Sequence, residues 1–228
     1  MQIKKYKSTV VAVENLVEGV FTLTLQSNSG RFKYDPGHFL HLAIDEYDPS
    51  LAWPESRCFS VQSSPEDSAL KLTYAVKGEF TKKIASSIKA GSEVWIKMPY
   101  GELFEQEHTK EHTVFISGGT GITPYLSLFT DSSFKSYSHP VLYAGFRDKS
   151  LNLYKEELRK AKEINPSLTV HEVYQDVHGI LDISTILKNT SHNTSFYISG
   201  PPVMIKSFKN FLIQNGVSEF QVKTDDWE

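Results

Sequence analysis

The sequence predicts an antiparallel β-barrel of six strands plus one helix, followed by an α/β domain with a five-stranded parallel sheet. Apolar residues recur mostly at every second position up to about residue 100, whereas short apolar runs alternate with helical stretches after about residue 112. The first pattern indicates strands with one buried face, and the second indicates a parallel sheet covered by helices. A charged segment, ELFEQEHTKEH, separates them. We therefore expect domains at residues 1–104 and 105–228.

In the first domain, apolar and polar residues alternate in several runs. These runs are separated by turn signals such as SNSG, DPG and AGS. The clearest runs are Phe21–Leu25, Leu70–Val76 and Val94–Met98. Helical spacing occurs only over about Glu79–Ile88, where Phe80, Ile84 and Ile88 share one face. Short strands with a single helix predict a small antiparallel barrel.

The second domain alternates strand and helix along its whole length. Expected strands lie at HTVFISG, PVLYAGF, LTVHEVYQ, SFYISG and EFQVKT, and expected helices at ITPYLSLF, NLYKEELRKAKEI, DISTILKN and PVMIKSFKNFLIQNG. The last helix carries its apolar residues on one face, and Gly216 marks its end. This order predicts a parallel sheet with helices on both faces.

Composition narrows the function classes. A formal charge of -3 offers little attraction for nucleic acid or for an anionic membrane. No stretch approaches eighteen apolar residues and no apolar segment follows the basic N-terminus, so we expect a cytoplasmic protein without membrane insertion. The single cysteine, Cys58, excludes an internal disulfide and a four-cysteine iron–sulfur site. His38 and His41 would point to opposite faces of a strand, so no metal site is predicted.

Glycines crowd the first turn from strand to helix in the second domain, where the sequence reads Gly118-Gly119-Thr120-Gly121. Such a turn lets the backbone approach a phosphate, and the N–H groups and dipole at the helix start favour an anion. Pro124 suits the first helical turn, where its missing N–H costs nothing. An ordinary glycine-rich turn is the alternative interpretation.

A second turn, Ser199-Gly200-Pro201-Pro202, follows the fourth strand of the same sheet. Parallel sheets bind ligands at the carboxyl ends of their strands, so this turn and the first one are expected at the same edge. A rigid turn that merely starts a helix is the alternative.

In the barrel, Arg57-Cys58-Phe59-Ser60 begins a strand whose alternation places Arg57 and Phe59 on one face and the other two residues on the opposite face. An arginine offers a fork for a pyrophosphate, an aromatic ring packs on a planar heterocycle, and a serine hydroxyl bonds a ring nitrogen. A surface arginine beside a core phenylalanine is the alternative.

These three segments, together with Lys77-Gly78-Glu79-Phe80-Thr81, occur in the order that resembles the ferredoxin–NADP reductase superfamily, which includes NADH-cytochrome b5 reductase-like proteins and reductase components of oxygenases. The resemblance covers nearly the whole chain. It implies an FAD-binding barrel and an NAD(P)-binding α/β domain that pass hydride from NAD(P)H to FAD. Electrons would then leave to a separate acceptor, either a ferredoxin- or flavodoxin-type protein, a cytochrome, an oxygenase or free flavin.

The resemblance also assigns residues to FAD. Arg57 would hold the pyrophosphate, Phe59 would lie along the flavin or ribose, and Ser60 would hydrogen-bond the isoalloxazine near its reactive nitrogen. Lys77, Gly78 and Thr81 would complete the phosphate site. Phe59 stands where the family often has tyrosine, so it lacks a hydroxyl that could bind the cofactor.

For the nicotinamide nucleotide the resemblance implies contacts from Gly119, Thr120, Gly121, Arg147, Gly200 and Pro201. A solvated charge is the alternative role for Arg147. Ser60, Ser199 and Trp227 are the expected catalytic residues. Ser199 replaces a frequent cysteine, and Trp227 would stack on the flavin, with a frayed chain end as its alternative role.

The sequence leaves five questions open. The chain could instead be a non-catalytic flavin- or nucleotide-binding redox sensor, or an electron-transfer subunit of a complex. Arg147 and Lys149 favour NADPH, whereas Asp148 and Asp176 favour NADH. Lys4, Lys5 and Lys7 either dock an acidic acceptor or only solubilise the terminus. The physiological direction and the oligomeric state are not predicted.

Overall fold

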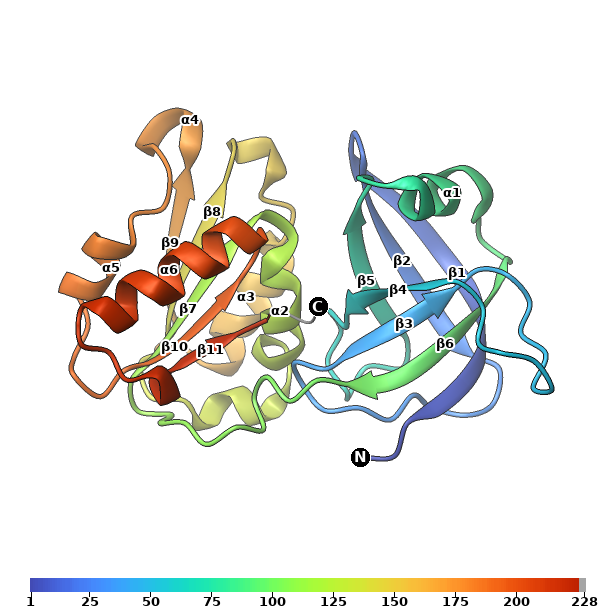
Figure 1. Ribbon diagram of the computed structural model, residues 1–228, viewed down its shortest axis with the longest axis horizontal. Coiled ribbons are helices and arrows are strands. Elements are labelled where there is room, and N and C mark those ends of the chain that lie inside the picture. The colour runs from blue at the N-terminus through green and yellow to red at the C-terminus, as the bar shows by residue number, and fades with distance from the viewer. Residues whose placement is uncertain (226–228) are drawn as a thin grey trace. The chain divides into compact units, whose positions relative to one another are not determined.

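The computed structural model describes residues 1–225 and divides into two compact units, one spanning Met1–Glu102 and the other beginning at Leu103. The first unit holds a six-stranded antiparallel sheet with one α-helix, and the second holds a five-stranded parallel sheet with helices (Figure 1). The predicted fold class is confirmed.

The first sheet has the strand order β4-β3-β6-β1-β2-β5. Its elements are β1 (Lys4–Val17), β2 (Val20–Ser27), β3 (Phe39–Ala43), β4 (Ser56–Ser60), β5 (Leu70–Ala75), α1 (Glu79–Ser87) and β6 (Glu93–Tyr100). The end of β4 meets the start of β5, where the Gln62 N–H donates to the Lys71 carbonyl at 2.8 Å. This contact brings the two outer strands together and closes the sheet into a barrel.

The strand β1 is much longer than the short strands that the sequence predicts. It pairs with β6 over Lys4–Thr9 and with β2 over Ser8–Val17. The first half of β1 therefore pairs mainly with β6 and the second half with β2. The register with β2 shifts between Val10 and Ala12. Such an irregularity bends a strand, which a small barrel needs in order to curve.

Alternation in the barrel matches burial. Leu23 and Leu25 are fully buried, as are the other alternate residues Leu70, Leu72, Val94, Ile96 and Met98. The helix α1 adds Phe80 and Ile84 to the same core. One apolar core therefore lies inside the curved sheet, as the period of two predicts.

The second sheet has the order β11-β10-β7-β8-β9, with all neighbouring strands parallel. Its strands are β7 (Thr113–Gly118), β8 (Val141–Phe146), β9 (Thr169–Tyr174), β10 (Ser195–Ser199) and β11 (Val222–Thr224). The α-helices are α2 (Thr123–Phe129), α3 (Lys155–Ile164), α4 (Gln175–His178), α5 (Ile183–Lys188) and α6 (Pro202–Gln214).

Helices cover both faces of this sheet (Figure 1). Phe115 and Tyr197 face one apolar cluster together with residues of α2 and α3, whereas Ile116 and Ile198 face another with residues of α5 and α6. Successive strand residues point to opposite faces, and both faces are apolar, so these strands read as continuous hydrophobic runs.

Two local features differ from the sequence prediction. The expected last strand, EFQVKT, begins as a short 3₁₀ turn over Glu219–Gln221 and pairs with β10 at only three residues. The short helix α4 directly follows β9, within the segment expected to be strand and loop. None of the helices in residues 1–225 is long and apolar enough to cross a membrane.

Candidate cofactor sites

Two turns meet at the carboxyl ends of β7 and β10. The chain leaves β7 through a 3₁₀ turn at Gly119–Ile122 into α2, and it leaves β10 through Gly200 and Pro201 into α6. The strands β7 and β10 are neighbours, while β8 lies on the other side of β7. Connections therefore run in opposite directions from β7 and β10, and this is the position at which open α/β sheets bind dinucleotides.

The two turns pack backbone against backbone. A Cβ atom on Gly121 would lie 2.5 Å from the Gly200 Cα and 2.6 Å from the Ser199 carbonyl oxygen. A Cβ on Gly200, whose φ is +149°, would lie 3.0 Å from the Gly118 nitrogen. Because backbone atoms cannot yield as a flexible side chain can, Gly121 and Gly200 are required for the turns to touch.

Gly119 has a different function in the same turn. It adopts a φ of +56°, and a Cβ there would meet no atom within 4 Å. Its neighbour Thr120 is partly exposed, and the Thr120 carbonyl accepts a hydrogen bond from the Thr123 hydroxyl at 2.9 Å. The open side of the turn is thus lined by backbone, which leaves room for a phosphate group to approach.

Two serines face each other in register across β7 and β10. Ser199 is 2% exposed, and its hydroxyl donates to the Asp225 Oδ2 at 3.0 Å. Ser117 is equally buried, and its Oγ has no hydrogen-bond partner in the described part of the chain. Buried hydroxyls are normally paired, so the unpaired Ser117 marks a place where a ligand group could bond.

Sequence reasoning missed Asp225. Its position just after β11, close to the chain end, is the only signal that the sequence offers, and the contact with Ser199 appears only once β10 and β11 are paired. The predicted stacking residue Trp227 lies outside the described residues.

The candidates for coenzyme selection lie after β8 and β9. Arg147 is exposed, and its carbonyl accepts from the Asp176 N–H at 3.1 Å, which joins the two loops through their backbones. The Asp148 carboxylate accepts from the Ser150 hydroxyl and N–H, and these bonds lower the pKa of Asp148. Asp148 therefore caps its own turn, while Arg147 and Asp176 are exposed.

In the barrel, Arg57 lies beside the start of α1. Its guanidinium carbon is 5.2 Å from the centre of the Phe80 ring, and Phe80 belongs to the first turn of that helix. The guanidinium also pairs with Glu55 at 2.9 Å, and the side chain is 54% exposed. A cation and a helix N-terminus thus lie next to each other, and both favour an anion.

The start of α1 is organised by Thr81. Its Oγ1 accepts from the N–H groups of Lys77 and Gly78 at 2.9 and 3.1 Å and donates to the Gly78 carbonyl at 2.9 Å. These two N–H groups are therefore engaged within the loop. The N–H groups of Glu79 and Phe80 follow in the first helical turn, where no intrahelical acceptor exists.

Phe59 lies in the barrel core. It is 8% exposed, lies opposite Leu40 in the register, and meets the Tyr74 ring edge-on at 6.0 Å. The Tyr74 hydroxyl is buried without a partner among the described residues, and burial raises its pKa to about 12. Ser60 is partly buried and pairs with Phe39.

Cys58 and the two histidines of the barrel complete the set of residues that the sequence singled out. Cys58 lies next to His41, with 3.5 Å between its Sγ and the His41 Nε2. Burial raises the pKa of the Cys58 thiol although Arg57 lowers it, so the thiol is protonated at neutral pH. His38 is buried, and its Nδ1 accepts from the Asp35 N–H at 2.8 Å.

The architecture is that of a barrel joined to a dinucleotide-binding α/β fold, and the comparisons with known proteins agree with it. A family model described as an FAD-binding domain matches residues 5–124, and one described as an oxidoreductase NAD-binding domain matches residues 115–210. The chain belongs to the ferredoxin–NADP reductase superfamily and carries both domains.

Individual relatives are distant. The reductase component of propane 2-monooxygenase from Mycolicibacterium goodii is 25% identical over 244 residues, covering 99% of this chain and 68% of the relative. A component of the Na(+)-translocating NADH-quinone reductase from Haemophilus influenzae is 30% identical over 158 residues, covering 62% of this chain and 38% of the relative. This chain therefore spans from little more than a third to about two thirds of these curated relatives.

A solved ferredoxin–NADP+ reductase from Neisseria gonorrhoeae, with bound FAD and NADP, has the same fold. Its TM-score is 0.76 at 19% identity, and the match covers 99% of this chain and 98% of the other. Both domains of this chain thus have counterparts in one continuous solved structure.

Proposed function

We propose that this protein is an FAD-dependent reductase that takes hydride from NAD(P)H and delivers electrons to a separate acceptor. The observation that carries the proposal is the contact between Gly121 and Gly200, because it brings two glycine turns together at the point where the connections of the sheet reverse, which is where open α/β sheets bind dinucleotides. The barrel supplies an independent anion site at Arg57 and the start of α1.

The residues of the barrel fit FAD. Arg57 would hold the pyrophosphate with its planar fork, and the first-turn N–H groups of α1 would add to this site. Thr81 would hold the loop of Lys77 and Gly78 in place for these contacts. Ser60 would bond the isoalloxazine. Phe59 would offer little surface to the cofactor, since it is 8% exposed and packs against Tyr74.

The residues of the α/β unit fit a nicotinamide dinucleotide. Gly119 and Thr120 would line its phosphates, together with Pro201 and the start of α6 from the neighbouring turn. Gly121 and Gly200 would act by allowing the two turns to meet. Arg147 would contact the phosphate or ribose from the loop after β8.

A bound FAD would supply the chemistry of accepting hydride from NAD(P)H and of passing electrons on singly or as a pair. The chain contributes binding and orientation. Asp225 would fix the rotation of the Ser199 hydroxyl, because that hydroxyl donates to its carboxylate. Ser117 would keep an unpaired hydroxyl for the carboxamide of the nicotinamide.

The acceptor is a separate molecule in this proposal. The chain's single cysteine cannot ligate an iron–sulfur cluster, and relatives bear names such as reductase component of propane 2-monooxygenase and of the naphthalene 1,2-dioxygenase system. An oxygenase or a ferredoxin-type protein is therefore the acceptor class that the resemblance favours.

An anaerobic titration tests this function. Protein reconstituted with FAD is mixed separately with NADH and NADPH while the visible flavin absorbance is followed. We expect rapid bleaching by one of the two nucleotides, which would also identify the coenzyme. A dithionite control shows that the bound flavin can be reduced. Bound flavin that dithionite bleaches but neither nucleotide does would favour a non-catalytic flavin-binding sensor or subunit.

A further inference from the structure

The strand β9 forms a free edge of the parallel sheet. Among the described strands it pairs with β8 alone. The Thr169 N–H donates to the Pro140 carbonyl at 3.0 Å, so Thr169 directs its backbone groups toward β8. Since these directions alternate along a strand, Val170 and Glu172 direct their N–H and carbonyl groups outward. Two residues thus offer a hydrogen-bonding ladder to another strand.

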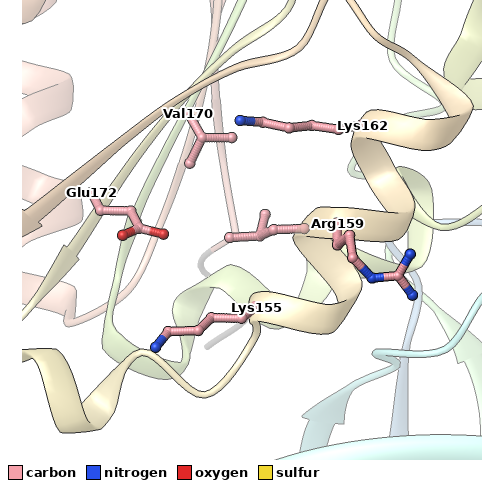
Figure 2. Close-up of a pocket in the computed structure, with 6 residues that line it drawn as sticks. Lys155, Arg159, Lys162, Val170 and Glu172 are labelled. Carbon is pink, nitrogen blue, oxygen red and sulfur yellow. The ribbon is translucent and has the colours of Figure 1, made fainter.

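A groove runs beside this edge. It is a hollow of about 450 Å³ between β9 and α3, and Val170 and Glu172 lie on its strand side (Figure 2). The helix contributes Leu158, which is 6% exposed and gives the groove an apolar floor. Val170 and Glu172 therefore both line the groove and direct their backbone groups outward from the sheet edge.

Two lysines of α3 line the groove. In Figure 2 the side chains of Lys155 and Lys162 extend from the helix toward β9, whereas Arg159 points away from the strand. Arg159 is paired with Glu156 and Glu163 on its own helix. Neither lysine has a hydrogen bond or ion pair to any described residue, so both ammonium groups are available to a ligand.

The groove has a positive charge although the whole chain is negative. Lys155 and Lys162 face one acidic lining residue, Glu172, in a chain whose net charge is -3, while Arg159 is neutralised by Glu156 and Glu163. The Glu172 carboxylate accepts from the Tyr174 hydroxyl at 2.6 Å, and that hydroxyl accepts from the Asn152 amide at 3.0 Å. Glu172 is thus held by its own strand, and the lysines attract negative charge.

From these contacts we propose that the β9 edge, with Lys155 and Lys162, docks an extended acidic segment of another protein as an additional strand. Main-chain hydrogen bonds to Val170 and Glu172 would provide affinity for the docked segment. The two lysines would provide specificity for acidic residues in that segment. This inference is independent of the cofactor chemistry, because none of these residues belongs to the proposed FAD or NAD(P) sites.

Spacing defines the preferred segment. Lys155 and Lys162 are seven residues apart on the helix, a rise of about 10 Å. Alternate residues on one face of a strand are about 6.7 Å apart, so acidic residues four positions apart span about 13 Å. Flexible lysine side chains bridge the difference, and the residue midway between the acids would lie over Leu158. The expected pattern is acidic, any, apolar, any, acidic.

The positive charge of the α3 lysines argues against a second copy of this chain as the segment that docks on β9. Two β9 edges paired about a two-fold axis would bring the α3 lysines of both copies to one seam, where like charges repel. An acidic partner removes this repulsion.

Fluorescence anisotropy tests the docking. The probe is a fluorescein-labelled peptide with the core Glu-Thr-Val-Thr-Glu, blocked at its C-terminus, added to the full chain loaded with FAD. We expect saturable binding that weakens with salt, and the double variant Lys155→Glu/Lys162→Glu should bind at least about tenfold more weakly. The matched control Lys188→Glu/Lys206→Glu changes the same charge at two exposed helix positions outside the groove and should bind within about twofold of wild type.

A second pair of variants separates main-chain pairing from charge. Glu172→Pro removes one outward N–H, and proline is tolerated at such an edge position. Glu172→Thr removes the same carboxylate but keeps the N–H. We expect Glu172→Pro to bind the peptide at least about tenfold more weakly than Glu172→Thr, with unchanged flavin content and unchanged bleaching by NAD(P)H.

Three results would overturn the docking proposal. One is equal binding of a peptide with the core Lys-Thr-Val-Thr-Lys, and another is equal binding by the lysine double variant. The third is a dimer in sedimentation that Glu172→Pro dissociates, which would make β9 a self-association edge. A failure of NAD(P)H to bleach the flavin would leave this test unaffected.

Discussion

The anion sites proposed for the two units depend on different parts of the chain. In the barrel the site depends on a side chain, the exposed Arg57, beside the first turn of α1. In the α/β unit it depends on backbone, because two glycine turns touch at Gly121 and Gly200. A side chain can be shortened without shifting the backbone. A contact between backbones cannot be changed unless the ends of both strands, β7 and β10, shift.

This difference separates binding from stability. Removing Arg57 should cost cofactor affinity and leave the barrel folded, since ion pairs of exposed groups contribute little to stability. Adding a side chain at Gly121 should lower both the stability of the α/β unit and the bleaching of the flavin by NAD(P)H. The two units therefore predict opposite patterns for equally small substitutions.

The largest effect is expected for Gly121→Ala. The added methyl group would lie 2.5 Å from the Gly200 Cα, and relief requires the β7 and β10 turns to separate. We expect the free energy of unfolding to fall by about 2–3 kcal/mol, the upper range for overpacking in a rigid site. Urea unfolding followed by circular dichroism measures this, and flavin bleaching by NAD(P)H should also be lost.

Gly78→Ala is the matched substitution in the barrel. A Cβ there meets no atom within 4 Å, and its φ of -130° suits any residue. We expect a loss of less than about 1 kcal/mol. Equal destabilisation by both substitutions would contradict the distinction between the two units.

A smaller effect is expected for Arg57 variants. Arg57→Ala should weaken FAD binding by about 10–100-fold, the range for losing hydrogen bonds to a charged group, while the melting temperature of the FAD-free protein stays nearly constant. Arg57→Lys should fall between wild type and Arg57→Ala, because an ammonium group keeps the charge but loses the planar fork. Equilibrium dialysis with FAD measures the dissociation constants.

Glu55→Gln is the control for this series. It removes the ion-pair partner of Arg57, so FAD binding should stay equal or become slightly tighter. If Glu55→Gln weakens FAD binding as much as Arg57→Ala does, then the ion pair itself, rather than a free guanidinium, forms the site.

Much of this architecture could be predicted from the sequence, because it depends on periodicity. Alternating apolar residues such as Leu70 and Leu72 predicted barrel strands, and the alternation of strand and helix predicted the parallel sheet. The two glycine-containing turns were also predicted to lie at the same edge of the sheet, and they follow the neighbouring strands β7 and β10. Each of these signals lies within a short stretch of chain.

What depends on contacts between distant segments could not be predicted. The sequence places Gly121 and Gly200 in two turns but does not show that they touch, and it gives no reason to pair Ser199 with Asp225. It also does not show that Thr81 engages the N–H groups of Lys77 and Gly78. Such contacts depend on strand order and on side-chain rotation, for which one sequence carries no local pattern.

The smallest expected effect concerns one histidine in each unit. Burial lowers the pKa of His41, with Lys97 adding to the effect, and burial also lowers the pKa of His108. Each group binds a proton more readily when unfolded, so its stabilising effect is complete above about pH 6.5, the usual pKa of histidine, and is lost as the pH falls below that value.

We therefore expect the melting temperature to fall between pH 7.5 and 5.5, and less steeply in His41→Gln and in His108→Gln. The His108 ring stacks on Tyr137 and its Nε2 lies 2.7 Å from the Tyr137 hydroxyl, so His108→Gln should also lower stability at pH 7.5. His41 meets Tyr100 edge-on at the barrel surface, so His41→Gln should mainly change the slope. Calorimetry at the two pH values measures both quantities. An unchanged slope in both variants would assign the pH dependence to other groups, whereas a change only in His108→Gln would place it in the α/β unit.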